Sequence, residues 1–529
     1  MYEFIPEECT GDLQKYIRRS VEGQAFDLDK VGFGNLKRIL FSIRGYEGLK
    51  DKKLRKILIN TLSEERQREL VRDLKKEEAI ANLHGDAYTL ALLPWRKGTK
   101  IVDFFRDHFY ISDEYLPVTV GRKSTHEILL PIGRQNDLFD YQEEVRLKIS
   151  NFISSSQLSV MVQLPTGSGK TRTSMSALVD WLNEKESIKK RHVIWLAHTQ
   201  ELCQQASEAF RKNWLLDGRQ EVELVELWGD AVVPKYSQSS GFWVAGYVKF
   251  VNAIDKLFTL GFEELVLVID EAHKSIAPSL LRAIDALSGR YSLKLIGLTA
   301  TPGRASSDLL ESKQLSRLFS SNLITATLLG SDPIGELQAR GILAPIRRYS
   351  LQTECDIELD LNEIGDVVVN KKTLSRLAAN PERNRKIVEV IRKQVTQQKK
   401  VIVFACSVDH ARTLSISLAK EGVVACAVDC EMSATARKLA VMSFKNMDVQ
   451  VLLNYGVLST GLDVPDIGAV VIARPTASIV LYSQMIGRGM RGKHVGGTAE
   501  CTVIDILDNI HEYGDLNEVY NYFENYWKK

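Results

Sequence analysis

The stretch LPTGSGKT at residues 164–171 continues from an apolar run, SVMVQL, at residues 159–164. An apolar strand that leads into a glycine-rich loop and then a helix points backbone N–H groups at a bound phosphate. Glycines at 167 and 169 permit the tight turn and a close approach of the backbone. The pattern predicts that Lys170 contacts the β- and γ-phosphates of ATP and that the Thr171 hydroxyl is a ligand of Mg²⁺.

The strict form of this loop has a glycine at the position of Leu164, so the alternative is an ordinary strand-to-helix turn. The form found here, with Pro-Thr-Gly, is typical of helicases. The residues expected to line the nucleotide are Pro165, Thr166, Gly167, Ser168, Gly169, Lys170 and Thr171.

A second apolar run ends in two acids, VLVIDEAH at residues 266–273. Asp270 is placed to hold Mg²⁺ through water, and Glu271 is placed to polarise the attacking water. Phosphoryl transfer needs such positioning and charge neutralisation rather than covalent chemistry. Two acids after a strand are alternatively the start of a helix. Their occurrence after the glycine-rich loop favours an ATP hydrolase.

Apolar runs alternate with helical stretches in two successive series, which predicts two tandem doubly wound parallel sheets. We expect these domains at 131–345 and 346–515, separated near GILAPIRRYS (341–350), where a glycine and a proline interrupt the pattern. A mainly helical domain is expected at 1–130 and a helix at 516–529. The ten apolar runs are at 159–164, 192–197, 242–246, 265–270, 293–298, 401–406, 423–428, 449–454, 469–473 and 502–506.

Composition restricts the class of protein further. A chain of 529 residues with 44% hydrophobic and 26% charged residues suits a globular protein of several domains. No apolar stretch reaches the length of about 18 residues that spans a membrane, and the start MYEFIPEECT has no signal-peptide pattern. The 7 cysteines show no disulfide framework, and we interpret the close pair Cys426 and Cys430 as buried apolar thiols. We therefore expect a cytoplasmic protein without a membrane partner.

Taken together, these motifs and six more segments resemble superfamily-2 DEAD/DEAH-box helicases over about residues 135–515, in order and in spacing. The resemblance implies that both sheets have the RecA-like fold and that the cofactors are ATP and Mg²⁺. The further segments are LFDYQEE (138–144), AHTQELCQQ (197–205), LTATP (298–302), FACSVDHA (404–411), LSTGLDVP (458–465) and QMIGRGMR (484–491).

The resemblance assigns roles to individual residues. An arginine that completes an ATP site across a cleft would make hydrolysis depend on closure of that cleft, which converts hydrolysis into movement. Catalytic roles fall to Lys170, Asp270, Glu271, Gln484, Arg488 and Arg491. Nucleotide contacts fall also to Tyr141, Gln142, His273, Gly461 and Asp463, and contacts to nucleic acid fall to His198, Thr199, Gln205, Thr299, Thr301, Ser407 and Thr460.

Within the superfamily the segment GRGMRGKHVGGTAECTVIDILDN (487–509) resembles the branch of XPB-like helicases, RadD-like helicases and type III restriction subunits, which act mainly on DNA. DEAD-box RNA helicases carry Asp where this chain has His273. RadD-like proteins tend to carry a cysteine cluster for zinc, which this sequence lacks. DNA is therefore the expected partner. The alternatives are an RNA-directed helicase, an adaptor without hydrolysis, and the motor subunit of a nuclease or phage-defence complex that translocates without strand separation.

The N-terminal region has its own charge pattern. Residues 31–80 contain 13 Lys or Arg and 8 Asp or Glu, an excess of +5 in a chain with a total of +2. The run KDKKLRK at 50–56 contains five of these basic residues. Such a run is either a solvated helix face or a surface that contacts phosphates. We expect this region to hold duplex DNA or a partner protein.

Overall fold

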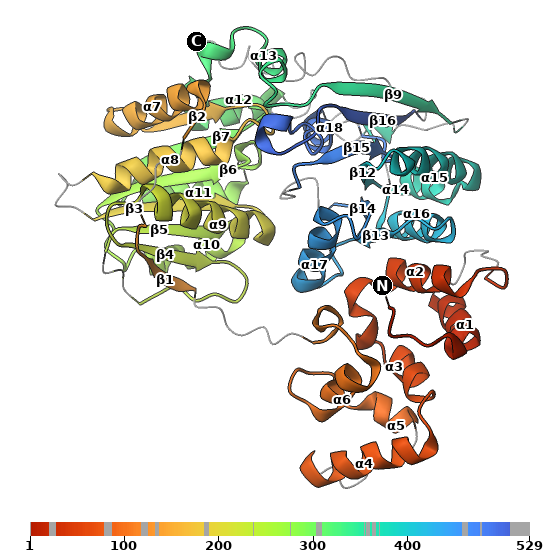
Figure 1. The fold of residues 1–529 in the computed structure, drawn as a ribbon. Helices are drawn as coiled ribbons and strands as arrows, with labels where there is room; N and C mark the ends of the chain where they lie inside the picture. The colour runs from red at the N-terminus through yellow and green to blue at the C-terminus, as the bar shows by residue number, and fades with distance from the viewer. Residues whose placement is uncertain are drawn as a thin grey trace.

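The computed structural model has three parts, a helical N-terminal region and two α/β lobes that face each other (Figure 1). The expectation of two tandem RecA-like parallel-sheet units after a mainly helical region is confirmed. The structure describes residues 2–20, 28–78, 87–117, 125–132, 137–184, 190–235, 237, 239–275, 277–302, 309–353, 355, 360–361, 367–369, 371–456, 464–476 and 479–507.

The first lobe contains an eight-stranded sheet in the order β1-β4-β5-β3-β6-β7-β2-β8, in which only β1 is antiparallel to its neighbour. Its strands are β1 (His126–Leu129), β2 (Ser159–Gln163), β3 (Arg191–Ala197), β4 (Val222–Leu227), β5 (Gly241–Gly246), β6 (Glu264–Asp270), β7 (Ser292–Thr299) and β8 (Leu323–Ile324). Its helices are α7 (Asp140–Ser154), α8 (Lys170–Asn183), α9 (Gln200–Asp217), α10 (Tyr247–Leu257), η4 (Ala272–Lys274), α11 (Pro278–Ser288), α12 (Leu309–Leu318), η5 (Thr327–Leu329) and α13 (Pro333–Ala339).

Both faces of this sheet are covered because alternate residues of each strand enter different cores. Along β3, Val193 and Trp195 belong to the cluster that includes residues of α7, α8 and α9. Ile194 and Leu196 belong to the cluster that includes residues of α10, α11 and α12. Successive side chains of a strand point to opposite faces, so a strand buried on both faces reads as a continuous apolar run.

The second lobe contains a six-stranded parallel sheet in the order β13-β14-β12-β15-β16-β9. Its strands are β9 (Ile346–Gln352), β12 (Lys400–Phe404), β13 (Ala425–Val428), β14 (Val451–Asn454), β15 (Ile467–Ile472) and β16 (Cys501–Leu507), and a separate hairpin pairs β10 (Asp360–Leu361) with β11 (Val367–Val368). Its helices are α14 (Lys371–Ala379), α15 (Pro381–Thr396), α16 (Val408–Lys420), α17 (Ala434–Lys445), α18 (Ile479–Ile486) and η6 (Lys493–Val495).

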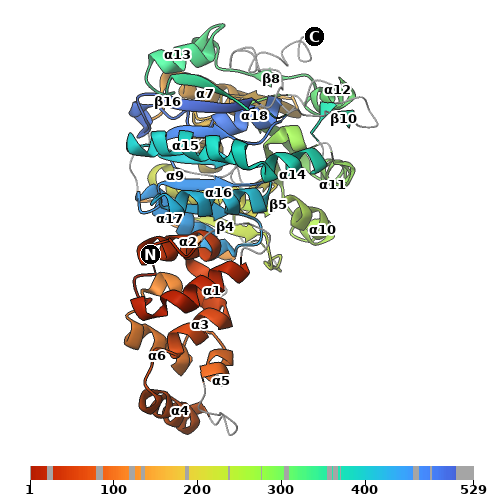
Figure 2. The ribbon, with the colours of Figure 1, turned by 90° about the vertical axis from the view of Figure 1, so that its right-hand side faces the viewer.

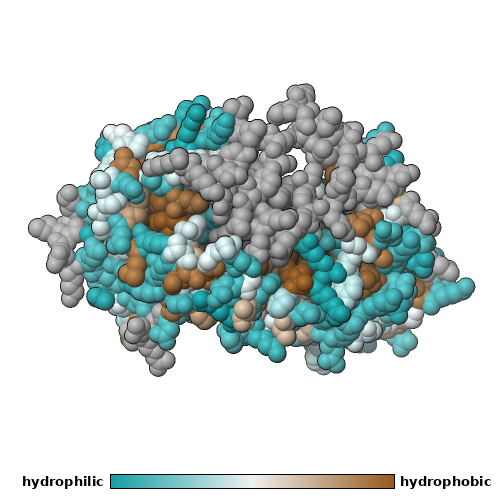
Figure 3. All heavy atoms as spheres, turned by 90° about the horizontal axis from the view of Figure 1, so that it is seen from above, coloured by the Kyte–Doolittle hydropathy of each residue, from teal (hydrophilic) through white to brown (hydrophobic). Residues whose placement is uncertain are grey.

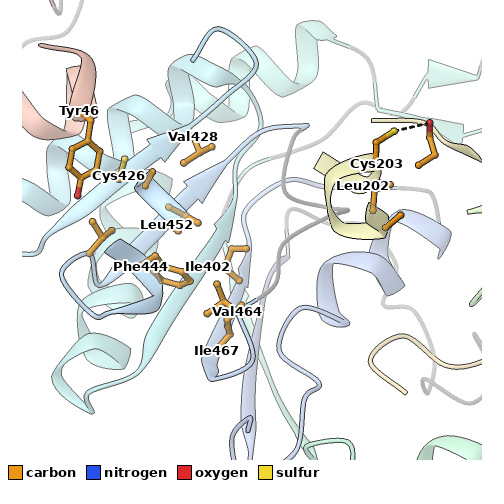
Figure 4. Close-up of a cluster of buried hydrophobic side chains, with 14 of the residues drawn as sticks. Tyr46, Leu202, Cys203, Ile402, Cys426, Val428, Phe444, Leu452, Val464 and Ile467 are labelled. Atoms are coloured by element: carbon orange, nitrogen blue, oxygen red, sulfur yellow. Dashed lines mark hydrogen bonds between the residues drawn. The ribbon is translucent and has the colours of Figure 1, made fainter. Parts of the chain in front are cut away.

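The N-terminal region packs on the second lobe, where α2 (Phe33–Arg44) lies beside α16 (Figure 2) and contacts the edge strand β13. The Ser42 hydroxyl donates to the carbonyl of Ala425 at 3.0 Å, and Asn35 Nδ2 donates to the carbonyl of Lys420 at 3.1 Å. The Tyr46 ring lies beside Cys426 of the second lobe (Figure 4). The Tyr46 hydroxyl hydrogen-bonds to Ser443. The elements of this region are η1 (Glu7–Cys9), α1 (Thr10–Ser20), α2 (Phe33–Arg44), η2 (Gly45–Lys50), α3 (Lys52–Ile59), α4 (Glu64–Glu78), α5 (Ala87–Leu92), α6 (Lys100–Phe109) and η3 (Asp113–Tyr115).

Two expectations from the sequence are wrong. Arg55 is 2% exposed and donates to the carbonyls of Leu49 and Ala91 at 2.7 and 2.6 Å, so it holds α3 in place and is not a surface cation. Cys430 is exposed, unlike Cys426, because it lies two residues after Val428, the last residue of β13, where the chain leaves the sheet.

All ten apolar runs contribute to strands of the two sheets. Strand β1 at His126–Leu129 joins the first sheet although it precedes the expected boundary at residue 130. The exact boundaries at 130, 345 and 515 stay predictions, and the helix expected at 516–529 lies outside the described residues. Seen from above, the described surface is mostly hydrophilic, with smaller apolar patches on both halves (Figure 3).

Candidate active site

The predicted phosphate-binding loop joins β2 to α8, which begins at Lys170. Gly167 and Gly169 have φ of +87° and +89°, in the left-handed region that side chains rarely adopt. A Cβ on Gly169 would also lie 2.3 Å from Gln142 Nε2. The loop therefore needs glycine at 169 for both its backbone conformation and its packing, and it directs the first-turn N–H groups of α8 toward the space above it.

Tyr141 and Gln142 on α7 hydrogen-bond to the backbone of this loop. The Tyr141 hydroxyl donates to the carbonyl of Ser168 at 2.6 Å, and Gln142 Nε2 donates to the same carbonyl at 2.9 Å. Burial raises the pKa of the Tyr141 phenol, so the phenol keeps the proton that it donates. Gln142 Oε1 accepts from the backbone N–H of Phe139 at 3.1 Å. These contacts give both side chains a structural task in the loop, while their contact with adenine stays a prediction.

The acids lie at the same edge of the sheet as the loop. Strand β7 lies between β6 and β2, and the register pairs Asp270 with Leu298 and Gln163 with Thr299. Carboxyl ends of parallel strands meet at one edge, which is where open α/β sheets bind ligands. The loop and the acids, which are about 100 residues apart in the sequence, therefore form a single site.

Charge balance at this edge involves Lys170, Asp270 and Glu271. Asp270 is 6% exposed, and burial raises the pKa of its carboxyl to about 6, while the charge of Lys170 acts in the opposite direction. Lys170 Nζ lies 3.9 Å from Glu271 Oε1. Glu271 has φ +52°, an uncommon conformation for a residue other than glycine. Its backbone N–H donates to Asp270 Oδ1 at 3.0 Å, so the two acids are held relative to each other.

His273 connects the acids to two other motifs. Its Nδ1 lies 3.2 Å from the Thr299 hydroxyl and 3.4 Å from Glu271 Oε2. Thr299 Oγ1 in turn donates to the carbonyl of Thr301 at 2.8 Å and accepts from its N–H at 3.1 Å. His273 Nε2 lies 3.5 Å from Gln484 Nε2, and Gln484 belongs to α18 in the second lobe. The network therefore runs from the acids to the LTATP segment and across to the other lobe.

Arg488 and Arg491 follow α18 and line the same cleft as Lys170, Asp270 and Glu271. The cleft has a volume of about 1060 Å³ and is lined by residues of both lobes. Gly487 lies against the phosphate loop, because a Cβ there would lie 2.3 Å from Thr166 Cγ2. The arginines and the loop thus share one cavity although they are far apart in sequence.

An ion pair that the sequence does not predict also spans the cleft. Arg437 Nη2 on α17 lies 2.9 Å from Glu201 Oε1 on α9. Both side chains line the cleft, and their partial exposure of 19% and 36% makes the pair sensitive to salt. No local pattern marks such a pair, because the two residues belong to different lobes. Glu201 lies within a recognisable motif segment, whereas Arg437 does not.

The residues expected to contact nucleic acid have more varied positions. Thr199 and Ser407 are N-caps, and their hydroxyls accept from the N–H groups of Leu202 and His410 at 3.2 and 3.0 Å. Gln205 on α9 lines the cleft. The ring of His198 lies 6.3 Å from that of Tyr247. Thr460, Gly461 and Asp463 lie outside the described residues.

These caps fix the first turns of α9 and α16. Backbone N–H groups at a helix N-terminus commonly bind phosphate. In the described part of the chain, no three His, Cys, Asp or Glu residues form a group that could hold a metal ion. No helix among the described residues is long and apolar enough to cross a membrane.

Two segments of the chain that contain these residues match known protein families. Residues 135–304, which contain the loop and both acids, match the res subunit of type III restriction enzymes, and residues 382–493, which contain Gln484 and both arginines, match the helicase conserved C-terminal domain. The chain belongs to the superfamily-2 helicases. The matched segments place it in the restriction-subunit branch of this superfamily.

This superfamily-2 helicase is 28% identical over 384 residues to the Saccharomyces cerevisiae protein IRC3, which carries a provisional ATP-dependent helicase name; the match covers 70% of this chain and 51% of IRC3. It is 24% identical over 383 residues to a 51.5 kDa protein of a Lactococcus phage, covering 70% of this chain and 71% of that protein. The solved structure of the helicase MrfA bound to DNA has a TM-score of 0.50 at 15% identity and covers 73% of this chain and 48% of that one, which shows a shared fold. The chain spans about half the length of IRC3.

Proposed function

We propose that this superfamily-2 helicase is a DNA-dependent ATPase that moves along DNA or unwinds it. One observation carries the proposal: a single cleft of about 1060 Å³ contains Lys170, Asp270 and Glu271 from the first lobe and Arg488 and Arg491 from the second. A site completed by two lobes is formed fully only when the lobes close. Hydrolysis and lobe movement are then linked, which is what a motor requires.

The proposed roles follow from charge and position. Lys170 and the N–H groups of the loop bind the β- and γ-phosphates, and Glu271 orients and polarises the attacking water. Arg488 and Arg491 stabilise the negative charge that develops on the transferred phosphoryl group. Gln484 and His273 relay the position of the second lobe to Glu271, since their side chains meet at 3.5 Å.

The donor set fits Mg²⁺. Magnesium is held by a few protein oxygens together with phosphate oxygens and water. Thr171 offers a hydroxyl at the start of α8, and Asp270 offers a buried carboxylate that lines the same cleft. The ion would neutralise charge on the β- and γ-phosphates, and it would also oppose the raised Asp270 pKa by placing a cation against the buried carboxylate.

Two arguments support DNA as the polymer. The first part of the chain matches the res subunit of type III restriction enzymes, and the segment 487–509 resembles the branch that acts mainly on DNA. A matched family of restriction subunits also favours a second candidate function, in which this chain is the motor of a restriction or phage-defence complex with a separate nuclease partner. In that case the motor translocates without strand separation.

The test is the rate of ATP hydrolysis by the full chain with single-stranded DNA, duplex DNA, RNA or no polymer. The proposal expects the highest rate with one of the DNAs. Hydrolysis stimulated by RNA but by neither DNA would overturn the DNA preference. A hydrolysis rate no higher than that of the Lys170→Ala variant under all conditions would favour an adaptor that binds nucleic acid without hydrolysing ATP. Displacement of a labelled strand from a partial duplex, compared with displacement of a triplex strand, then separates unwinding from translocation.

A further inference from the structure

Tyr247 is a partly buried side chain that the roles above do not use. It is the first residue of α10, directly after β5, and its ring packs against the core cluster of the first lobe. Its hydroxyl donates to the carbonyl oxygen of Asp270 at 2.9 Å. Burial and the nearby acids raise the pKa of this phenol, so it remains a donor. The hydrogen bond therefore ends on the backbone of the catalytic acids.

The peptide unit between Asp270 and Glu271 is held at both ends by side chains. Tyr247 binds its carbonyl oxygen, and Asp270 Oδ1 accepts its N–H at 3.0 Å. The next residue, Glu271, has φ +52° and ψ +51°. A left-handed conformation in a residue with a side chain persists only where its surroundings impose it. The orientation of this peptide sets the direction of the Glu271 carboxylate, so the Tyr247 hydroxyl is one of the groups that impose it.

The ring of Tyr247 also lies near the segment before α9. Its ring centroid lies 6.3 Å from that of His198, which immediately precedes the helix cap Thr199. His198 and Thr199 belong to the segment expected to contact the nucleic-acid backbone. Tyr247 thus lies near this segment through its ring and binds the Asp270–Glu271 peptide through its hydroxyl, so it is placed to transmit a movement of one to the other.

We propose that Tyr247 is a positioning residue that couples nucleic acid at the His198–Thr199 segment to the orientation of Glu271. The inference rests on the proposed role of Glu271 in hydrolysis. A ligand that moves the His198 ring shifts the Tyr247 ring against it, and the hydroxyl carries that shift to the Asp270 carbonyl. Nucleic acid thereby raises the rate of the chemical step without a change in ATP affinity.

The test is Tyr247→Phe in the full chain, which removes one hydroxyl and keeps the ring. We expect kcat with saturating DNA to fall by about three- to tenfold, the range that corresponds to one neutral hydrogen bond, while KM for ATP and the Kd for DNA stay unchanged. The rate without DNA should fall less, so the degree of stimulation also decreases. A purely structural role would instead lower the melting temperature and leave kcat unchanged.

Tyr291→Phe is the matched control. The Tyr291 hydroxyl also donates to backbone carbonyls in the same lobe, those of Leu257 and Phe258 at 3.4 and 3.3 Å, but these lie outside the cleft. Wild-type kcat and stimulation in Tyr247→Phe would overturn the inference, and so would equal losses in both variants. If the wild-type chain itself is not stimulated by any nucleic acid, the proposed function fails and the basal kcat of Tyr247→Phe still decides whether the hydroxyl positions Glu271.

Discussion

Gly487→Ala should separate the two halves of the ATP site without removing any catalytic group. The added Cβ would lie 2.3 Å from Thr166 Cγ2 and 2.9 Å from Thr166 Cβ. Carbon atoms pack at about 3.5 Å or more, so the second lobe must withdraw from the loop by about 1 Å at this point. Thr166 cannot turn aside easily because its side chain is β-branched. A misplacement of about 1 Å costs on the order of 10²-fold in rate, and Arg488 is the next residue.

The assay is DNA-stimulated hydrolysis together with binding of a fluorescent ATP analogue. We expect kcat to fall by on the order of 10²-fold while analogue affinity changes little, because the loop itself is intact. Adding Thr166→Ser removes the closest clashing atom and should restore part of the rate. Gly34→Ala is the control, since a Cβ there meets nothing within 4 Å. Wild-type kcat in Gly487→Ala, or no rescue by Thr166→Ser, would refute closure at this contact.

Further substitutions test single groups. Lys170→Ala should abolish hydrolysis with the fold intact, because the phosphates lose their main cation; activity equal to wild type would remove the loop assignment. Glu271→Gln should bind ATP and remain on DNA as a long-lived complex, measured by dissociation rate; binding no better than in Lys170→Ala would contradict its role in activating water. Replacing both Lys52 and Lys53 with Gln should weaken DNA binding and reduce its salt slope by about 0.9 for each phosphate that these lysines neutralise. Arg55→Gln should instead lower the free energy of unfolding by about 1–3 kcal/mol, because its hydrogen bonds to buried carbonyls are removed. An unchanged salt slope would make the exposed lysines a solvated surface.

Much of the fold is predictable because of how parallel sheets are buried. Strands such as β3 and β6 enter a core on each face, and so they appear as continuous apolar runs. Strand β4 does not stand out in the sequence because VELVEL contains glutamates that are nonetheless buried. Strand β9 does not stand out because five of its seven residues are polar or charged and most are exposed at the sheet edge.

The phosphate loop and the acids are predictable because each motif is contiguous, and strand register alone then brings them together. Contacts between distant segments are not predictable. The buried position of Arg55 depends on the packing of α3 against α5, and the Arg437–Glu201 ion pair depends on how the lobes meet. The hydroxyl of Tyr247 meets the Asp270 carbonyl only after β5 and β6 have taken their places on either side of β3.

The most direct test of the two-lobe site is single-turnover hydrolysis by Arg488→Ala and Arg491→Ala, measured beside the Kd for ATP. Both arginines come from the second lobe, yet they line the cleft that contains Lys170 and Glu271. Their charge is needed most as the transition state forms, so the account predicts a fall in the hydrolysis rate of about 10³-fold for an arginine finger with little change in Kd. A wild-type hydrolysis rate with weaker ATP binding would contradict a site completed by both lobes.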